Sequence, residues 1–123
     1  MRMWMVDPKL MCRHHLIAEH NEGFHMGIGI LKRKLKIDGF TRNNCIEILS
    51  MRTRHDALVQ EMLARGYRHN SPSFDIPEDI LEFYAEYLHV KVNVRESERL
   101  LRTRCSKCAK LFNQRELDLL NIC

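Results

Sequence analysis

Apolar residues at helical spacing between Met51 and Arg65 constrain the fold more than any other feature of the sequence. Side chains three or four positions apart share one face of a helix, and the segment ends at Gly66, the residue type favoured just after a helix. The segment therefore predicts an amphipathic helix that packs one face against the rest of the chain. The residues of its predicted buried face are Met51, His55, Leu58, Val59, Met62 and Leu63.

A second helix is predicted to begin at Asp7 and Pro8. Asp accepts hydrogen bonds from the free N–H groups of a first turn, and Pro is favoured at the first helical position. His15, Glu19 and Glu22 follow at i, i+4 and i+7, so they are predicted to share a face turned away from the apolar stripe. The predicted apolar stripe of the same helix contains Leu10, Ile17, Ala18, Asn21 and Phe24.

Turn-forming residues divide the rest of the chain into short elements. Gly23 predicts a bend or break in the helix, Asp38-Gly39 predicts a turn, and Pro77 predicts the start of another helix. Residues 90–94 alternate valine with polar side chains, which allows a short extended segment. We expect a mainly α protein, a compact single-domain helical chain with short irregular connections.

The length of 123 residues fits one domain. The balance of 45% apolar and 29% charged residues is typical of a globular protein, and no apolar run approaches the roughly 20 residues that span a bilayer. The first residues lack the apolar region of a signal peptide, and five cysteines, an odd number, argue against a secreted disulfide framework. We therefore expect an unprocessed cytoplasmic protein.

Positive charge is concentrated in the first part of the chain. The formal net charge is +4, and the whole excess lies in residues 1–75, with 12 basic and 8 acidic side chains. The basic residues are densest at Lys32, Arg33, Lys34 and Lys36. Such a run is usually a solvated helix face. The alternative is a polyanionic partner, nucleic acid rather than a membrane, because no large apolar face accompanies the charge.

Cysteine and histidine spacing gives no complete metal site. Cys105 and Cys108 form half of a zinc knuckle, but only Cys123 and no histidine follows them. The run of residues 15–20 has the spacing H-x-x-x-E-H, one residue longer than the inverted zincin motif. We therefore expect a reduced pair of structural cysteines, ordinary surface histidines and no bound metal.

Three segments carry the most distinctive motifs. Residues 15–22 read HLIAEHNE. The segment of residues 54–72 contains RHD at 54–56, EM at 61–62, RGY at 65–67 and SP at 71–72. The segment of residues 1–10 contains MRMW at 1–4 and DPKL at 7–10. The first closely resembles the catalytic helix of the phage endonuclease V-type pyrimidine-dimer DNA glycosylase family. The other two are similar to segments of bacterial and phage relatives in that family. The resemblance covers roughly residues 1–75.

This resemblance implies an unusual nucleophile, the α-amino group of the first residue of the mature chain. Matching the catalytic helices without a gap places Met1 at that position and Glu22 at the catalytic glutamate. An α-amine has a reference pKa of about 8, against about 10.4 for lysine, so part of it is neutral at pH 7. Attack on deoxyribose C1′ would release the base and leave an iminium, and Glu22 would assist β-elimination. The implied activity is that of a DNA glycosylase and abasic-site lyase with no cofactor and no metal.

The implied partner is double-stranded DNA that carries a damaged or abasic nucleotide, in a bacterium or in the host of a virus. Where the family has arginines near its catalytic glutamate, this chain has Asn21 and His25, and the family's aromatic and basic C-terminal stretch is absent. The resemblance therefore predicts the chemistry better than the lesion. We expect DNA contacts from Arg2, His15, His25, Lys32, Arg33, Lys34, Arg52, Arg54 and Arg68.

Two other functions fit the same residues. A non-catalytic DNA-binding module would use the same basic surface, and a zinc-stabilised interaction protein would be built around Cys105 and Cys108. In the favoured interpretation, residues 1–75 hold the catalytic helices and the DNA-binding surface. Residues 76–123 then form a helical C-terminal part of the same domain.

Overall fold

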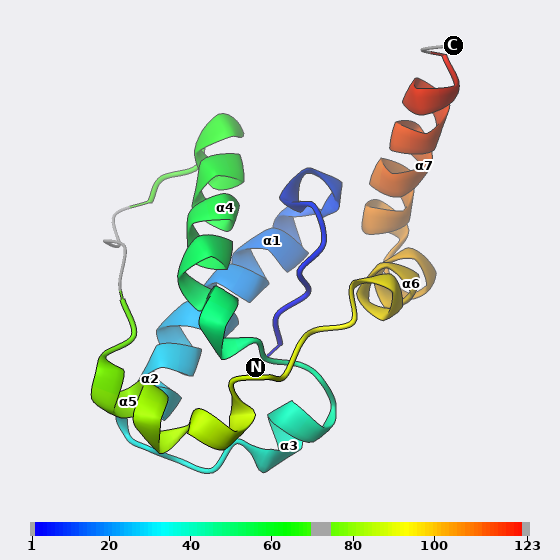
Figure 1. The fold of residues 1–123 in the computed structure, drawn as a ribbon. Coiled ribbons are helices and arrows are strands. Elements are labelled where there is room, and N and C mark those ends of the chain that lie inside the picture. Colours follow the sequence, from blue (N-terminus) through cyan, green and yellow to red (C-terminus); the bar gives the residue numbers. More distant parts are fainter. Residues whose placement is uncertain (1, 70–74, 122–123) are drawn as a thin grey trace.

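The computed structural model, which describes residues 2–69 and 75–121, is an assembly of helices (Figure 1). No strand occurs in those two ranges, so the prediction of a mainly α protein is confirmed. The α-helices are α1 (Arg13–His20), α2 (Gly27–Lys32), α3 (Asp38–Arg42), α4 (Met51–Ala64), α5 (Glu78–Phe83), α6 (Val94–Arg104) and α7 (Ser106–Leu120). The shorter elements are the 3-10 turns η1 (Pro8–Leu10), η3 (Ile48–Ser50) and η4 (Ala85–Tyr87) and the π-helix η2 (Asn21–Met26).

Residues 90–94, whose alternation allows an extended segment, form no strand. Val90 and Val92 are buried in the irregular connection that precedes α6, and Val94 is the first residue of that helix. The alternation therefore marks two buried side chains in a connecting segment. Across the parts of the chain that are described, no helix combines the length and the apolar character that crossing a membrane requires.

The first long helical run continues through Gly23 instead of breaking there. α1, η2 and α2 follow one another without a gap, and Gly27 at the junction of η2 and α2 keeps helical dihedral angles. A wider π-helical turn thus takes the place of the predicted break. Gly23 is buried, and a Cβ atom at this position would lie 3.9 Å from Met3 Cγ. The N-terminal segment therefore packs directly against η2.

The sequence places the start of this helical run too early. Asp7 and Pro8 begin only the single 3-10 turn η1, in which the Asp7 carboxylate accepts a hydrogen bond from the Lys9 backbone at 3.0 Å. α1 begins at Arg13, and the preceding Cys12 caps it through its side chain. The expected turn at residues 38–39 is also wrong, because these residues begin α3.

α1 buries a different face from the predicted one. Its buried residues include Leu16 and Glu19, whereas Ile17 is half-buried and Asn21 is exposed. The reason is an ion pair in which both carboxylate oxygens of Glu19 accept hydrogen bonds from Arg54 of α4, at 2.6 Å and 2.9 Å. A side chain that would otherwise stay in water is thereby held between the two helices.

α4 confirms the prediction that most constrains the fold. The helix ends as expected, with Gly66 at φ 82°, in the left-handed region that favours glycine. Leu63 departs from the predicted buried face and is 50% exposed, because Arg54 takes a place in the buried stripe. The buried residues of α4 are Met51, Arg54, His55, Leu58 and Met62.

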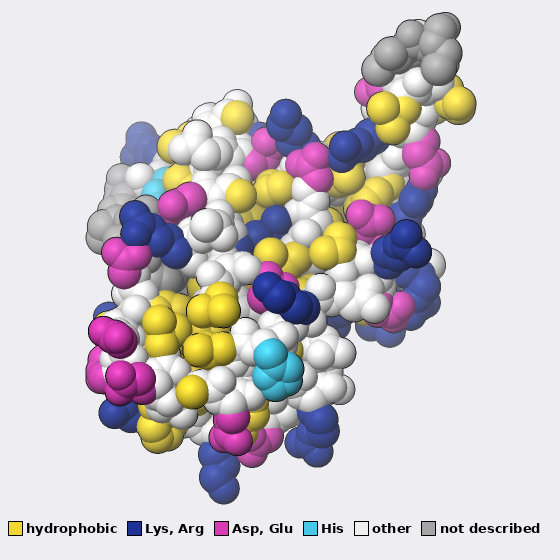
Figure 2. All heavy atoms as spheres, viewed as in Figure 1, with side chains coloured by type: hydrophobic (Ala, Val, Ile, Leu, Met, Phe, Trp, Pro, Cys, Tyr) yellow, Lys and Arg dark blue, Asp and Glu magenta, His cyan; other side chains and the backbone are white. Residues whose placement is uncertain are grey.

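α6 and α7 pack against each other beside the main body, and the end of α7 projects away from it (Figure 1). Cys108 and Phe112 anchor the base of α7, where both are buried. Figure 2 shows hydrophobic side chains on the projecting end, and the exposed residues there include Leu117, Leu119 and Leu120. The base of α7, and not its tip, is therefore the part that can contribute to a site on the body.

Candidate functional site

Glu22 is an exposed residue of η2 and lines a pocket of about 520 Å³. Two cations, Arg13 at the start of α1 and Lys107 at the start of α7, line the same pocket. π-helical turns are frequent at functional sites, because they displace side chains from regular helical positions. The pocket therefore sets one carboxylate beside two cations, which suits a phosphate bound near a developing positive charge. The remaining lining residues are His14, Ile17, Ala18 and Asn21.

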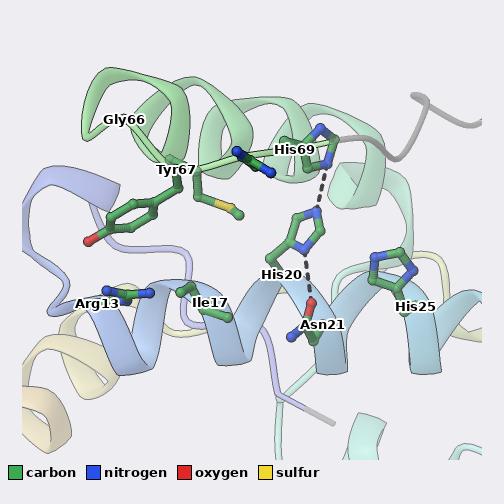
Figure 3. A pocket seen from close by; sticks show the side chains of 10 residues that line it. Arg13, Ile17, His20, Asn21, His25, Gly66, Tyr67 and His69 are labelled. Atoms are coloured by element: carbon green, nitrogen blue, oxygen red, sulfur yellow. Dashed lines mark hydrogen bonds between the residues drawn. The ribbon is translucent and has the colours of Figure 1, made fainter.

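A neighbouring pocket of about 600 Å³ shares Arg13, Ile17 and Asn21 with the first. These three residues follow at intervals of one helical turn, so they form a ridge between the two hollows. Figure 3 shows Arg13 near Tyr67, and the Arg13 guanidinium carbon lies 4.9 Å from the centre of the tyrosine ring. A cation beside an aromatic ring suits a nucleotide, because the cation can contact the phosphate and the ring can stack on the base.

His20 and His69 line the second pocket (Figure 3), and together with His55 they form a histidine cluster. His20 Nε2 lies 3.0 Å from His69 Nε2, and His20 Nδ1 lies 3.2 Å from Asn21 Oδ1. Burial lowers the pKa of His20 and of His69, and the nearby His55 and His25 lower it further. In the neutral state, His20 donates from Nδ1 to Asn21 and accepts at Nε2 from His69.

Acidification is expected to lower stability through this cluster. Because the pKa values of His20 and His69 are lowered on folding, the unfolded chain binds more protons just below the ordinary pKa of 6.5. The contribution of these two histidines to the free energy of unfolding is therefore complete above pH 6.5 and decreases as the pH falls below that value. Thermal denaturation between about pH 8 and about pH 5.5 should show a smaller loss of Tm for His69→Gln than for the wild type. The matched variant His89→Gln, at an exposed histidine, should behave like the wild type, and equal losses in all three proteins would contradict the assignment.

The N-terminal segment reaches the same helical run. Met3 is fully buried beside Gly23, and its backbone N–H donates to Cys45 O at 2.8 Å. Arg2 is half-buried, with its guanidinium carbon 4.3 Å from the centre of the Trp4 ring. Met1, the predicted nucleophile, lies outside the described residues.

Two predicted DNA contacts, Arg54 and His15, instead contact other residues of the chain. Arg54 cannot meet a phosphate, because it is buried and bonded to Glu19 and, at 2.6 Å, to Val6 O. His15 is half-buried, with Nδ1 at 3.2 Å from Cys12 Sγ, so it faces a thiol cluster. In both cases a partner distant in the sequence determines the position of the side chain.

Apart from the half-buried Arg2, the other predicted DNA contacts are exposed but dispersed. His25 and Arg68 line the pocket of the histidine cluster, and Arg52 pairs with Asp75. The residues at the end of α2 and just after it, Lys32, Arg33 and Lys34, line neither of these two pockets. Figure 2 shows Lys and Arg side chains interspersed with Asp and Glu on the face drawn.

The sequence prediction missed several residues of the two pockets, among them Arg13, Tyr67 and Lys107. Arg13 has a detectable signal, because it begins the i, i+4, i+8 line that continues with Ile17 and Asn21. Tyr67 has a weaker one, as an aromatic residue between a glycine and an arginine in a polar loop. Lys107 has none, since only the packing of α7 brings it to the pocket.

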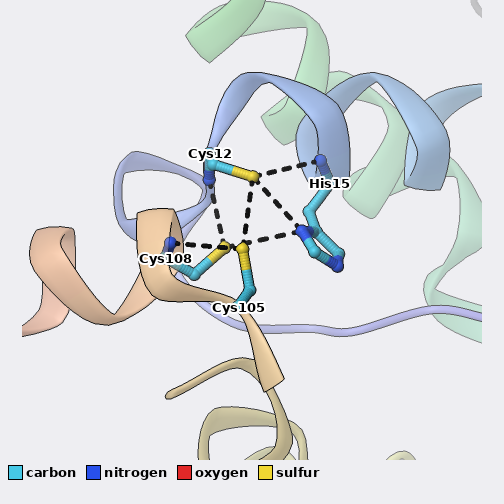
Figure 4. Close-up of side chains that lie close together, drawn as sticks. All are labelled: Cys12, His15, Cys105 and Cys108. Carbon is cyan, nitrogen blue, oxygen red and sulfur yellow. Dashed lines mark hydrogen bonds between the residues drawn. The ribbon is translucent and has the colours of Figure 1, made fainter. Parts of the chain in front are cut away.

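Two groups of side chains that could together hold a metal ion occur in the described ranges. One contains Cys12, His15, Cys105 and Cys108 (Figure 4), and the other is the histidine cluster His20, His55 and His69. The sequence indicates no further ligand for Cys105 and Cys108, whereas the structure places Cys12 and His15 beside them. The partners of Cys105 and Cys108 lie upstream, at the start of α1, while Cys123 is outside the described residues.

A comparison with family models identifies the family of the chain. The model described as pyrimidine dimer DNA glycosylase matches residues 1–75, which is more than half of the chain. The chain belongs to the pyrimidine dimer DNA glycosylase family. Family membership implies DNA glycosylase activity in general and DNA as the substrate, and it confirms the resemblance seen in the sequence.

The family match includes Glu22 and the loop with Tyr67, and it excludes Cys105, Lys107 and Cys108. Comparison with curated proteins and with solved structures gave no significant match. This glycosylase therefore joins a family-type first part to a C-terminal part, residues 76–123, that the family model does not cover.

Proposed function

We propose that this glycosylase breaks the glycosidic bond of a damaged base, one base of a pyrimidine dimer as the family indicates, and then cleaves the abasic strand through one covalent intermediate. The observation that carries the proposal is the pocket at η2, where Glu22 is exposed beside Arg13 and Lys107. The two cations suit the phosphates that flank the reacting nucleotide, and the carboxylate suits the positive charge that develops on the sugar.

The nucleophile in this proposal is the α-amine of Met1. Met3, two residues further along the chain, packs beside Gly23 of η2, the element that carries Glu22, and this packing supports the assignment. Its ordinary pKa of about 8 leaves a usable neutral fraction at pH 7, whereas an unperturbed lysine is under about 1% neutral. A free α-amine therefore needs no buried environment to react.

The reaction then has two stages. The amine nitrogen forms a bond to C1′ while the bond from C1′ to the base breaks, and opening of the sugar gives an iminium at C1′. The Glu22 carboxylate accepts the proton from C2′, and the C3′–O bond breaks to release the phosphate. Water hydrolyses the iminium and returns the free amine. A flipped nucleotide is required, because C1′ is inaccessible within a stacked duplex.

Borohydride trapping tests the proposal. It reduces the iminium to a stable amine, so duplexes with an abasic site or a cyclobutane pyrimidine dimer should give a covalent complex, and undamaged duplex should not. Digestion and mass spectrometry should locate the adduct on the Met1 nitrogen. Acetylation of that nitrogen or an N-terminal extension should eliminate the complex, while a C-terminal tag should not.

Lys107 provides the sharpest internal control, because its ε-amine lines the same pocket. Lys107→Arg keeps the cation and removes the amine, so the variant should still be trapped. An adduct on Lys107, Lys32 or Lys34 would contradict the N-terminal nucleophile. Binding to damaged DNA with no trapping on any duplex would instead indicate a non-catalytic DNA-binding protein.

A further inference from the structure

We propose that Cys12, His15, Cys105 and Cys108 bind one structural Zn²⁺ ion that fastens the start of α1 to the start of α7. Neither the family match nor the proposed reaction assigns a role to these four residues. Figure 4 shows their donor atoms directed toward one another from two helix starts. All four atoms lie within 4.8 Å of one another.

The spacing of the ligands is the first argument. Cys12-x-x-His15 and Cys105-x-x-Cys108 are two short chelating pairs, one at each helix start. Zinc sites commonly combine two such pairs, since two residues between ligands let both reach one ion from a single turn. The sequence alone shows half of the site, because the two pairs are separated by most of the chain.

The distances are the second argument. In a tetrahedral site with Zn–S near 2.3 Å and Zn–N near 2.0 Å, two sulfurs lie about 3.8 Å apart and a sulfur and a nitrogen about 3.5 Å apart. Cys12 Sγ lies 3.8 Å from Cys105 Sγ, and His15 Nδ1 lies 3.2 Å from Cys12 Sγ and 3.6 Å from Cys108 Sγ. The donor atoms thus already surround a volume of the size that the ion needs. The Cys12–Cys105 separation is also far longer than the roughly 2.05 Å of a disulfide bond.

Backbone N–H groups donate hydrogen bonds to all three sulfurs of the group. Cys108 Sγ accepts a hydrogen bond from Cys12 N at 3.3 Å, Cys105 Sγ accepts one from Cys108 N at 3.4 Å, and Cys12 Sγ accepts one from His15 N at 3.5 Å. Cys12 and Cys105 are also the capping residues of α1 and α7, where the helix dipoles favour negative charge. Three thiolates and one imidazole form a donor set that selects zinc over harder cations such as Mg²⁺.

The site is closed, which assigns it a structural role. Four protein ligands fill a tetrahedral shell and leave no position for water or substrate. Cys12 and Cys108 are buried. The ion would nevertheless influence the pocket of Glu22, because Arg13 directly follows one ligand and Lys107 directly precedes another. It would therefore fix the position of both pocket cations.

Metal analysis of the full-length protein tests the proposal. Protein purified under reducing conditions with Zn²⁺ and then dialysed should retain one zinc per chain. Replacement by Co²⁺ should give the intense visible absorption and thiolate charge-transfer bands of tetrahedral sulfur coordination. Removal of the ion with a chelator should lower Tm, and added Zn²⁺ should restore it.

Variants identify the ligands. Cys105→Ser should lose most of the bound zinc, while His15→Cys should keep it, because a fourth thiolate can replace the imidazole. Cys45→Ser is the matched control, at a cysteine outside the group, and should bind one zinc with an unchanged Co²⁺ spectrum. If Cys105→Ser does not fold, the spectrum of the wild type decides the question.

Three results would overturn the proposal. They are wild-type protein without zinc after dialysis, a Co²⁺ spectrum without sulfur bands, and full zinc retention by a folded Cys105→Ser variant. The last result would show that Cys105 is not a ligand.

Discussion

Glu22→Gln is expected to reduce strand cleavage at an abasic site by about 10²- to 10⁴-fold, the usual contribution of a general acid or base. The amide keeps the size of the side chain but cannot accept the C2′ proton or offset the charge of the iminium. Glu22 is exposed, so the substitution should leave Tm unchanged. DNA affinity should stay within several-fold, because the phosphate-binding cations remain. Single-turnover cleavage and fluorescence anisotropy on the same duplex measure the two quantities.

Glu82→Gln is the matched control for this experiment. Glu82 is an exposed glutamate of α5, and its substitution should change neither cleavage nor affinity. Wild-type turnover by Glu22→Gln would remove Glu22 from the mechanism. Equal losses in both variants would indicate a nonspecific effect of charge.

Arg54→Met is expected to lower the free energy of unfolding by about 3–5 kcal/mol, the usual cost of leaving one member of a buried ion pair without its partner. Arg54 donates two hydrogen bonds to Glu19, and the two side chains are 5% and 0% exposed. Arg54 also donates to Val6 O, so its removal loosens α1, α4 and the N-terminal segment together. Urea denaturation monitored by circular dichroism measures the change.

Two variants separate the ion pair from general damage to α4. Glu19→Leu combined with Arg54→Met removes both charges, and it should be less destabilised than Arg54→Met alone. Arg52→Met removes an exposed arginine of the same helix that pairs with Asp75, and it should cost less than about 1 kcal/mol. If the loss in the free energy of unfolding of the double variant equals the sum of the losses of Glu19→Leu and Arg54→Met, the two side chains act independently, and the ion pair does not account for the destabilisation.

Local patterns in the sequence predict much of this fold. The apolar spacing and Gly66 define α4, because helix periodicity and a left-handed terminal glycine are properties of neighbouring residues. Glu22 is exposed, but the predicted face that it shares with His15 and Glu19 is wrong, because Glu19 is buried and Glu22 lines its pocket with Ile17 and Asn21. The π-helix escapes prediction, since Gly23 is also the residue expected at a break.

The features that escape local patterns depend on partners far along the chain. Glu19 is buried because Arg54 lies opposite, and periodicity alone assigns a carboxylate to solvent. Cys105 and Cys108 find their partners at Cys12 and His15, whereas a search among the residues that follow finds no site. Pairings of this kind become visible only when the packing of α4 and α7 is known.

The π-helix also restricts how the length of this chain can vary. The Gly27 N–H donates to Glu22 O five residues earlier, so η2 contains more residues per turn than the α-helices on either side. Deleting one residue there would give a regular α-helix and leave the orientation of α2 nearly unchanged, because the wider π turns hold one more residue than the α turns that would replace them, but it would remove the displaced side-chain positions at the pocket. Relatives that keep this pocket should therefore keep the extra residue of the π-helix, and their other differences in length should lie in the connecting loops.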